Sequence, residues 1–213
     1  MLYMPGLRLQ TATIRDMCIT SAAASDPQAQ RWLGWQAQDL IPERGRERLL
    51  AMPPGQGRIM SPRPGKWFLA AIDEADGRLA GAIGADEDSG EVGGWLAPRF
   101  RGRGLGASLF AGAAEFAHQH LGVPSVIAAT EPGNAACIGA LVSAGFSPAT
   151  GPDTHPLPNG RVVFVHWFRH ESTQPTTCEA WGPTETPRWR ARPSTGRGLA
   201  AGRSRRRGAS PRG

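Results

Sequence analysis

A glycine-rich segment near the middle of the chain has the composition of an anion-binding loop. It reads Arg101-Gly102-Arg103-Gly104-Leu105-Gly106, and an apolar pattern with helical spacing follows it at once. Glycines at alternate positions let backbone N–H groups turn toward one point without interference from Cβ atoms. The first turn of the following helix adds unpaired N–H donors and the positive end of the helix dipole. This arrangement suits a phosphate or pyrophosphate group, to which Arg101 and Arg103 can add charge-assisted hydrogen bonds.

Two other phosphate-binding motifs and a ligand-free turn compete with this interpretation. A P-loop ends in Gly-Lys-Ser/Thr, whereas the dipeptide after Gly106 is Ala-Ser, which excludes it. A dinucleotide fingerprint matches superficially at residues 102–107, with Glu131 as its acid. However, the preceding strand is expected to end at Ala97, too far before the first glycine of that fingerprint. A glycine-rich surface turn without a ligand stays open on the motif alone.

The segments that must position the loop follow in the order strand, loop, helix, strand, helix. An apolar run at residues 94–97 precedes the loop, and a second run at residues 126–129 follows the helix. A turn at residues 131–134 then leads into a short helix that ends near Gly145.

The N-terminal part of the chain predicts one strand and two helices. Alternating residues indicate a strand at residues 7–14. Asp16 is expected to cap a helix over residues 17–24. A second helix is predicted to begin at Pro27, with Asp26 as its N-cap.

Further strands are predicted on both sides of the loop. Residues 67–72 and 79–84 predict a β-hairpin, and residues 90–97 return as a third antiparallel strand. The pair Gly93-Gly94 predicts a bulge in that strand, because glycine inside a strand often marks one. The last strand is expected at residues 162–168.

Three motifs in this order resemble the GCN5-related N-acetyltransferase (GNAT) family. Residues 101–106 are similar to its acetyl-CoA motif Arg/Gln-x-x-Gly-x-Gly/Ala, and residues 94–98 to its fourth strand and the exit from it. Residues 134–146 are similar to its Asn-x-x-Ser … Leu-Gly-Phe segment. Residues 27–35 resemble the RimJ/RimL-like branch, which includes ribosomal-protein N-terminal acetyltransferases and in which this part walls the acceptor site. The resemblance covers roughly residues 7–170.

The resemblance implies an α/β (α+β) fold. It consists of a mixed, mostly antiparallel sheet of about seven strands, with helices on both faces. The fourth and fifth strands, here residues 90–97 and 126–129, are splayed apart in this family. The pantetheine arm of the cofactor lies in the gap and bonds to the free backbone of the fourth strand.

Acetyl-CoA is accordingly the expected co-substrate, and no metal is expected. Loop amides would bind the diphosphate, and Asn134 would reach the pantetheine arm or the strand. Cys137 stands where this branch usually carries serine. The cofactor-binding residues implied are Trp95, Leu96, Ala97, Arg101, Gly102, Arg103, Gly104, Leu105, Gly106, Ala107, Ser108, Asn134 and Cys137.

The activity implied is that of an N-acetyltransferase, which moves acetyl from acetyl-CoA directly to a primary amine. The acceptor would be a protein N-terminus, an amino acid or a small-molecule amine. Because the attacking amine must be neutral, a carboxylate or a water that it orients must remove a proton. Glu91 ranks first for this role, followed by Glu131 and Glu87. A solvated acidic turn at residues 86–88 is the structural alternative.

Protonation of the leaving thiolate has no evident side chain. Many family members use a tyrosine after the asparagine motif, but the only tyrosine here is Tyr3, and Leu141 stands at the matching place. His155 and His166 are expected to be structural. The missing tyrosine keeps open a second class, a catalytically silent acyl-CoA-binding or interaction protein. A third class is a toxin-like acetyltransferase that acts on aminoacyl-tRNA.

Composition divides the chain into an acetyltransferase domain at residues 1–170 and a tail at residues 171–213. The tail is rich in arginine, proline and glycine and is expected to be disordered. Its nine arginines and three glutamates account for the whole net charge of +6. Nucleic-acid contact by this tail is less favoured than a solvated segment without a specific role.

The remaining composition points to a cytoplasmic protein without a membrane partner. Three widely spaced cysteines form neither a disulfide framework nor a zinc pattern. No apolar run approaches the roughly 20 residues that span a bilayer, and the N-terminus lacks the pattern of a secretory signal. A homodimer is left open.

Overall fold

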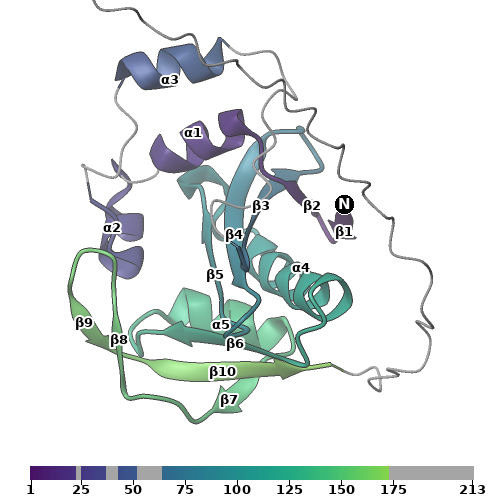
Figure 1. The fold of residues 1–213 in the computed structure, drawn as a ribbon, viewed down its shortest axis with the longest axis vertical. Helices are drawn as coiled ribbons and strands as arrows, with labels where there is room; N and C mark the ends of the chain where they lie inside the picture. Colours follow the sequence, from purple (N-terminus) through teal and green to yellow (C-terminus); the bar gives the residue numbers. More distant parts are fainter. Residues whose placement is uncertain (23–24, 37–42, 52–63, 173–213) are drawn as a thin grey trace, which may run out of the picture. The chain divides into compact units, whose positions relative to one another are not determined.

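The structure is a computed structural model that describes residues 1–22, 25–36, 43–51 and 64–172. From residue 173 onward, the predicted tail lies outside the described residues. Figure 1 gives the order of the elements, which are listed here. The helices are α1 (Ile14–Ala22), α2 (Pro27–Leu33), α3 (Glu43–Leu50), α4 (Leu105–His120) and α5 (Ala135–Ser143), and η3 (Pro98–Phe100) is a short 3-10 turn. The strands are β1 (Leu2–Met4), β2 (Leu7–Thr11), β3 (Lys66–Asp73), β4 (Leu79–Asp86), β5 (Val92–Leu96), β6 (Ser125–Thr130), β7 (Ser147–Ala149), β8 (Thr154–Pro156), β9 (Val162–Phe164) and β10 (His166–Glu171).

The described strands pair in an antiparallel manner within separate sheets. A five-stranded sheet has the order β1-β2-β3-β4-β5, a three-stranded sheet has the order β6-β10-β7, and β8 pairs with β9. The α+β class and the mostly antiparallel pairing are therefore confirmed. The pairing differs from one sheet of about seven strands, because β5 and β6 do not form a ladder.

The separation of β5 from β6 confirms the splayed strands. The two strands share a single parallel bridge, between Glu91 and Ile127, and the Ile127 N–H donates to Gly90 O at 2.9 Å. Beyond this bridge they belong to different sheets. Backbone groups on the facing edges of the two strands consequently lack a strand partner.

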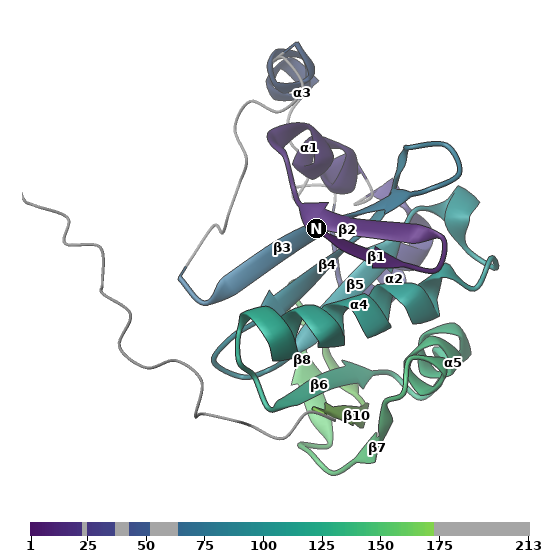
Figure 2. The same ribbon diagram turned by 90° about the vertical axis from the view of Figure 1, so that its right-hand side faces the viewer.

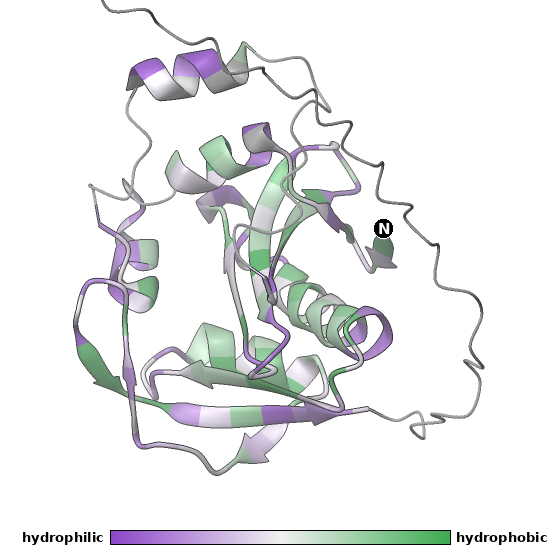
Figure 3. Ribbon diagram, viewed as in Figure 1, coloured by the Kyte–Doolittle hydropathy of each residue, from purple (hydrophilic) through white to green (hydrophobic). Residues whose placement is uncertain are grey.

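Helices cover both faces of the five-stranded sheet. Along β3, Leu69 and Ala71 join the main core with residues of α4, whereas Ala70 and Ile72 join a smaller core with Met17 of α1. Figure 2 shows α1 and α4 on opposite sides of this sheet. The strand alternation therefore directs successive side chains to two different helices. In Figure 3 the ribbons of α4 and α5 are mostly hydrophobic, while α3 is largely hydrophilic.

The two N-terminal helices test the capping predictions. Helix α2 begins at Pro27, and the Asp26 side chain accepts from the Gln28 N–H, as predicted. Helix α1 begins earlier than expected, because Thr13 caps it: the Asp16 N–H donates to Thr13 Oγ1 at 3.1 Å. Asp16 returns the contact by accepting from the Thr13 N–H at 2.8 Å, which completes a capping box. Its predicted position as the N-cap was wrong.

The predicted bulge at Gly93-Gly94 was also wrong. Both glycines pair in regular register with β4, Gly93 opposite Gly84 and Gly94 opposite Ile83. A Cβ on Gly94 would lie 3.0 Å from Leu109 Cδ2 and 3.1 Å from Ile83 Cδ1. Glycine is therefore needed here for the close approach of α4 to β5. The predicted last strand is interrupted at Val165, where β9 ends and β10 begins.

Helix α4 also approaches β2 closely, which gives a test of the packing. A Cβ on Gly112 would lie 2.5 Å from Leu9 Cδ1 and 2.9 Å from Met4 Cγ. Because Leu9 is fully buried, we expect Gly112→Ala to destabilise the protein by about 1–3 kcal/mol in urea denaturation. The matched control is Gly139→Ala in α5, where a Cβ meets nothing within 4 Å. That variant should be stabilised by roughly 0.5–1 kcal/mol, and effects of the same sign at both sites would contradict this packing.

Candidate functional site

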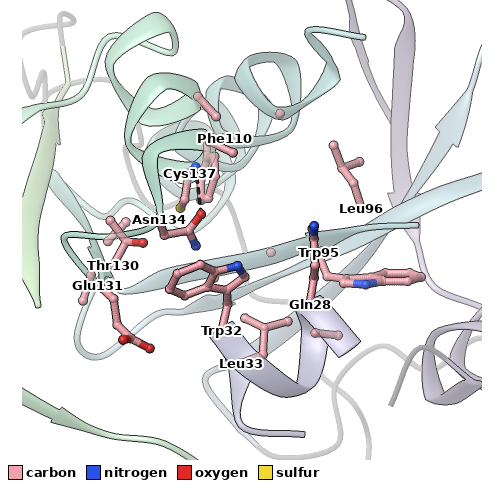
Figure 4. Close-up of a pocket in the computed structure, with 18 of the residues that line it drawn as sticks. Gln28, Trp32, Leu33, Trp95, Leu96, Phe110, Thr130, Glu131, Asn134 and Cys137 are labelled. Carbon is pink, nitrogen blue, oxygen red and sulfur yellow. Dashed lines mark hydrogen bonds between the residues drawn. The ribbon is translucent and has the colours of Figure 1, made fainter. Parts of the chain in front are cut away.

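A cavity of about 460 Å³ lies where β5 and β6 diverge. Its walls come from α2, both strands, the N-terminus of α4, the β6–α5 turn with α5, and the β8–β9 region. Figure 4 shows labelled side chains of α2, β5, β6, α4 and α5 around it, with Trp32 reaching inward from α2. A Cβ on Gly133 would lie 3.7 Å from Trp32 Cη2, so this indole closes on the turn after β6.

The glycine loop opens this cavity to the start of α4. Gly102 and Gly104 have φ angles of 71° and 77°, in the left-handed region that favours glycine. Gly104 is the N-cap of α4 and offers no side-chain acceptor to the first turn. Gly106 lines the cavity, and a Cβ there would lie 3.0 Å from Ala140 Cβ of α5. The loop thus leaves the first N–H groups of a 16-residue helix available to an anion.

The two arginines of the loop are directed at protein carboxylates. Arg101 forms an ion pair with Asp26, donates from Nη1 to Gln28 Oε1 at 2.9 Å and donates from Nε to Leu96 O at 2.9 Å. Arg103 lies 3.1 Å from Asp73 Oδ2, and the Asp73 side chain is almost completely buried. Both guanidinium groups expected to contact a phosphate thus also make structural ion pairs, and each positive charge is balanced by one carboxylate. Main-chain N–H groups at the start of α4 are the donors at this loop whose partial positive charge is not balanced in this way.

Other predicted loop residues also hold the loop in place. The Ser108 hydroxyl donates to Pro5 O, in the turn between β1 and β2, at 2.7 Å. The Leu105 side chain is buried in the main core. The Ala107 N–H donates to Gly104 O at 3.2 Å and is thus already satisfied.

The register of β5 decides which of its backbone groups face the gap. The Ala97 N–H donates to Ala80 O at 2.8 Å, so this group is directed at β4. Because successive residues alternate, the backbone groups of Trp95 also face β4, and those of Gly94 and Leu96 face the gap. Of the three residues expected to bind pantetheine through their backbone, only Leu96 is oriented to do so, and its carbonyl already accepts from Arg101.

Asn134 and Cys137 meet at the start of α5. Asn134 caps this helix, because its Oδ1 accepts from the Cys137 N–H at 3.2 Å. Figure 4 shows the amide nitrogen of Asn134 on the cavity side of this contact. Burial raises the pKa of the Cys137 thiol, and a hydrogen bond with Thr130 only partly opposes this. The thiol is therefore protonated near neutral pH, which argues against a nucleophilic cysteine.

The three candidate bases lie in different surroundings. Glu131 lines the cavity, but its Oε1 accepts from Arg31 at 2.7 Å and from Arg161 at 3.1 Å. Glu87 is exposed, accepts from Trp67 Nε1 at 3.2 Å and does not line the cavity. Glu91 directly precedes β5 and does not itself line the cavity.

His155 connects Glu91 to the cavity. The His155 Nε2 atom lies 3.9 Å from Glu91 Oε1, and the imidazole itself lines the cavity. This distance exceeds a direct hydrogen bond and suits a bridging water. The sequence alone predicts a structural role for His155, because no local pattern joins it to Glu91.

Sequence reasoning also missed the side chains that join α2 to distant segments. Arg31 and Trp32 lie in residues 27–35, which were expected to wall the acceptor site, but no local pattern indicates that Arg31 meets Glu131 across 100 positions of sequence or that Arg161 joins them. Among the described residues, no group of three or more His, Cys, Asp or Glu could hold a metal ion. Within the same residues, no helix is long and apolar enough to cross a membrane.

Comparisons with known proteins agree with this geometry. A family model described as an acetyltransferase (GNAT) domain matches residues 7–147. A comparison with curated protein sequences gave no match.

Solved structures share the fold at low sequence identity. A ribosomal-protein-S5-alanine acetyltransferase from Vibrio fischeri is 14% identical to this chain, with a TM-score of 0.60. The match covers 85% of this chain and 98% of that one. Spermidine N-acetyltransferase from Vibrio cholerae, in complex with CoA and spermine, is 14% identical, with a TM-score of 0.58 over 78% of this chain and 96% of that one. An aminoglycoside acetyltransferase in complex with coenzyme A is 16% identical, with a TM-score of 0.55 over 78% and 94%. At these identities the likeness concerns the fold alone.

The ion pair of Asp26 with Arg101 predicts a pH-dependent contribution to stability. Burial of Asp26 raises the pKa of its carboxyl, but the hydrogen bonds from Arg101, Gln28 and Trp95 and the charge of Arg101 outweigh this, and the net pKa is lowered. A lowered folded-state pKa stabilises the protein above the unfolded pKa, and this contribution is lost as pH falls through the folded value. Asp26→Asn keeps a good N-cap but should cost about 1–3 kcal/mol at pH 7.

The difference in unfolding free energy between wild type and Asp26→Asn should begin to narrow as pH falls below about 4, the ordinary aspartate pKa. It should vanish once pH has fallen through the lowered folded-state pKa of Asp26. Urea denaturation at pH 7 and at lower pH measures it. The control is Asp76→Asn, whose exposed carboxylate lies 3.9 Å from Arg78 and should contribute less than about 1 kcal/mol. A constant difference between wild type and Asp26→Asn at all pH values would contradict the proposed ionic origin.

Proposed function

The chain belongs to the GNAT acetyltransferase family, in its RimJ/RimL-like branch, and we propose that it transfers acetyl from acetyl-CoA directly to a primary amine. The divergence of β5 and β6, with a cavity that reaches the glycine loop, is the observation that carries this proposal. In the transfer, the amine nitrogen forms a bond to the thioester carbon and the carbon–sulfur bond breaks. CoA leaves as the thiolate, and one amine proton passes to a base.

The diphosphate of the cofactor is assigned to the N-terminus of α4. The left-handed Gly102 and Gly104 turn the chain so that the first helical N–H groups face outward. Because the charges of Arg101 and Arg103 are balanced by Asp26 and Asp73, the main-chain N–H groups supply the unbalanced attraction for an anion. Pantetheine would then follow the gap, within reach of the backbone of Gly94 and Leu96 and the amide of Asn134.

The base is assigned to His155, with Glu91 as its orienting carboxylate. His155 lines the cavity directly, whereas the Glu131 carboxylate is shared by two guanidinium groups and Glu87 lies outside the cavity. A neutral imidazole can accept the amine proton at one ring nitrogen while the other, Nε2, faces Glu91. This keeps Glu91 as the first-ranked carboxylate but places it one step from the amine.

No side-chain acid is assigned to the leaving thiolate. Leu141, at the position of the family tyrosine, is fully buried in the main core and does not line the cavity. The thiolate would therefore leave unassisted or take its proton from water. Because Leu141 replaces the tyrosine, a protein that binds acyl-CoA without catalysing transfer is the alternative function. Turnover of amines in an acetyl-CoA consumption screen distinguishes the acetyltransferase from this alternative.

Gly104→Glu tests the diphosphate site. The substitution puts a carboxylate at the start of α4, where it would repel the diphosphate, so calorimetry should show acetyl-CoA affinity lowered by roughly 100-fold or more. Gly122→Glu is the matched control, because Gly122 has a φ of 68° and equally open surroundings. Because Gly122 lies just beyond the C-terminal end of α4, the Gly122→Glu variant should bind acetyl-CoA as the wild type does. Near-normal affinity of Gly104→Glu would contradict the site.

His155→Ala and Glu91→Gln test the base. We expect kcat to fall by about 10²-fold or more for His155→Ala and by a smaller factor for Glu91→Gln, with the acetyl-CoA dissociation constant unchanged. The control is His166→Ala, because His166 is exposed and does not line the cavity. Steady-state kinetics at saturating acetyl-CoA measures these effects. An unchanged kcat in His155→Ala would remove this residue from the mechanism.

A further inference from the structure

Glu131, which lines the cavity, is shared by two arginines that flank it outside the lining, and the three residues form the Arg31–Glu131–Arg161 cluster. Arg31 belongs to α2, Glu131 follows β6, and Arg161 lies between β8 and β9. Glu131 Oε1 lies 2.7 Å from Arg31 Nη1 and 3.1 Å from Arg161 Nη2. Arg161 Nη2 also donates to Arg31 O at 3.1 Å. The cluster joins three segments. Because two arginines share one glutamate, its net charge is +1.

This cluster lies across β5 from the helix that starts at the glycine loop. Helix α2 packs against Trp95 through Ala29, whereas α4 packs on the other face of β5, where Leu109 meets Gly94. Successive residues of a strand point to opposite faces, so α2 and α4 are separated by β5. A donor bound at α4 therefore enters the gap from one face, and an acceptor amine must approach from the face with α2 and the cluster.

Both guanidinium groups of the cluster keep donors available for a ligand. The side chains of Arg31 and Arg161 are 51% and 40% exposed, whereas that of Glu131 is only 16% exposed. A guanidinium has five N–H donors, and the contacts with Glu131 use one nitrogen of each arginine. Arg31 is further held in place over the Trp32 ring, with 4.4 Å from Cζ to the ring centroid. An incoming carboxylate would thus find two fixed cations.

The rest of the described cavity wall disfavours a polycationic acceptor. Glu131 is the one carboxylate among the described residues that line the cavity, and two guanidinium groups already share it. A polyamine would need unpaired carboxylates to offset the loss of hydration of its ammonium groups. Most of the acceptor-side wall is apolar instead, with Trp32, Leu157 and Val163 in it.

We infer that the acceptor is a small amino acid or close derivative with a free carboxylate and an apolar side chain. Its carboxylate binds Arg31 and Arg161, its apolar side chain packs against Trp32 and Leu157, and its amine is directed at His155. This inference rests on the proposed acetyl transfer and narrows its substrate class. The amine attacks the thioester carbon, loses its proton to His155 and releases CoA as the thiolate.

A comparison of L-leucine with L-leucinamide tests the carboxylate contact. The two probes share side chain and amine, but the amide lacks the negative charge. We expect Arg161→Gln to lower kcat/KM for leucine by about tenfold or more, and to change kcat/KM for leucinamide much less. Taking the leucine-to-leucinamide ratio in each protein cancels the different basicity of the two amines. Arg161→Lys should retain part of the preference, since it keeps the charge.

Arg169→Gln is the matched control. Arg169 is 47% exposed and lies 3.7 Å from Glu171, so it is an arginine of similar exposure whose carboxylate partner, unlike Glu131, does not line the cavity. Its substitution should leave the leucine-to-leucinamide ratio at the wild-type value. A ratio that is unchanged in Arg161→Gln, or spermidine and a peptide N-terminus preferred over leucine in wild type, would overturn the inference while leaving the acetyltransferase intact.

Binding of the product separates this inference from the proposed chemistry. Calorimetry of N-acetyl-L-leucine against the CoA-saturated protein needs no turnover. We expect Arg161→Gln to weaken this binding by about tenfold and to leave N-acetyl-L-leucinamide unaffected. Absence of turnover with every amine, but retained product binding with this pattern, would remove the proposed function and keep the ligand class. Absence of N-acetyl-L-leucine binding, or equal weakening of both ligands, would overturn the inference.

Discussion

The failure of β5 and β6 to pair is the constraint on which the rest of the structure depends. After the bridge between Glu91 and Ile127, two strand edges carry backbone polar groups without a strand partner. The chain satisfies part of this edge itself, because the Arg101 guanidinium bonds to Leu96 O. The surrounding helices and the β8–β9 hairpin line the gap instead of filling it, which leaves a cavity of about 460 Å³.

The charges around this gap follow a consistent arrangement. Arg101 and Arg103 sit beside an anion-binding helix terminus, yet each is neutralised by an aspartate, and they hold the loop to α2 and to the end of β3. The loop conformation is therefore set before any ligand binds, and its N–H groups need little reorganisation. On the other face of β5 two arginines share one glutamate, which leaves the Arg31–Glu131–Arg161 cluster with a net charge of +1. The proposed acceptor would approach from this face.

The features that could be predicted from the sequence are those written in short segments. The glycine loop, the Asp26 cap followed by Pro27, and the hairpin of β3 and β4 each depend on neighbouring residues, and each has a local signal. The partners of Arg101, Arg103 and Glu131 lie 75, 30 and up to 100 positions away, and no local pattern indicates them. Gly94 was misread for a related reason: its lack of a side chain makes room for Leu109, which only the packed structure brings there.

The ion pair between Asp26 and Arg101 links the two sides of the cleft. It fastens the start of α2, which carries the acceptor wall, to the loop at the start of α4. A shift of either segment must therefore be followed by the other or break the tie. If donor binding changes the position of the loop, it alters the affinity for the second substrate, and thermodynamic reciprocity requires an equal effect in return. The Asp26–Arg101 ion pair would then contribute to the coupling free energy between the two ligands.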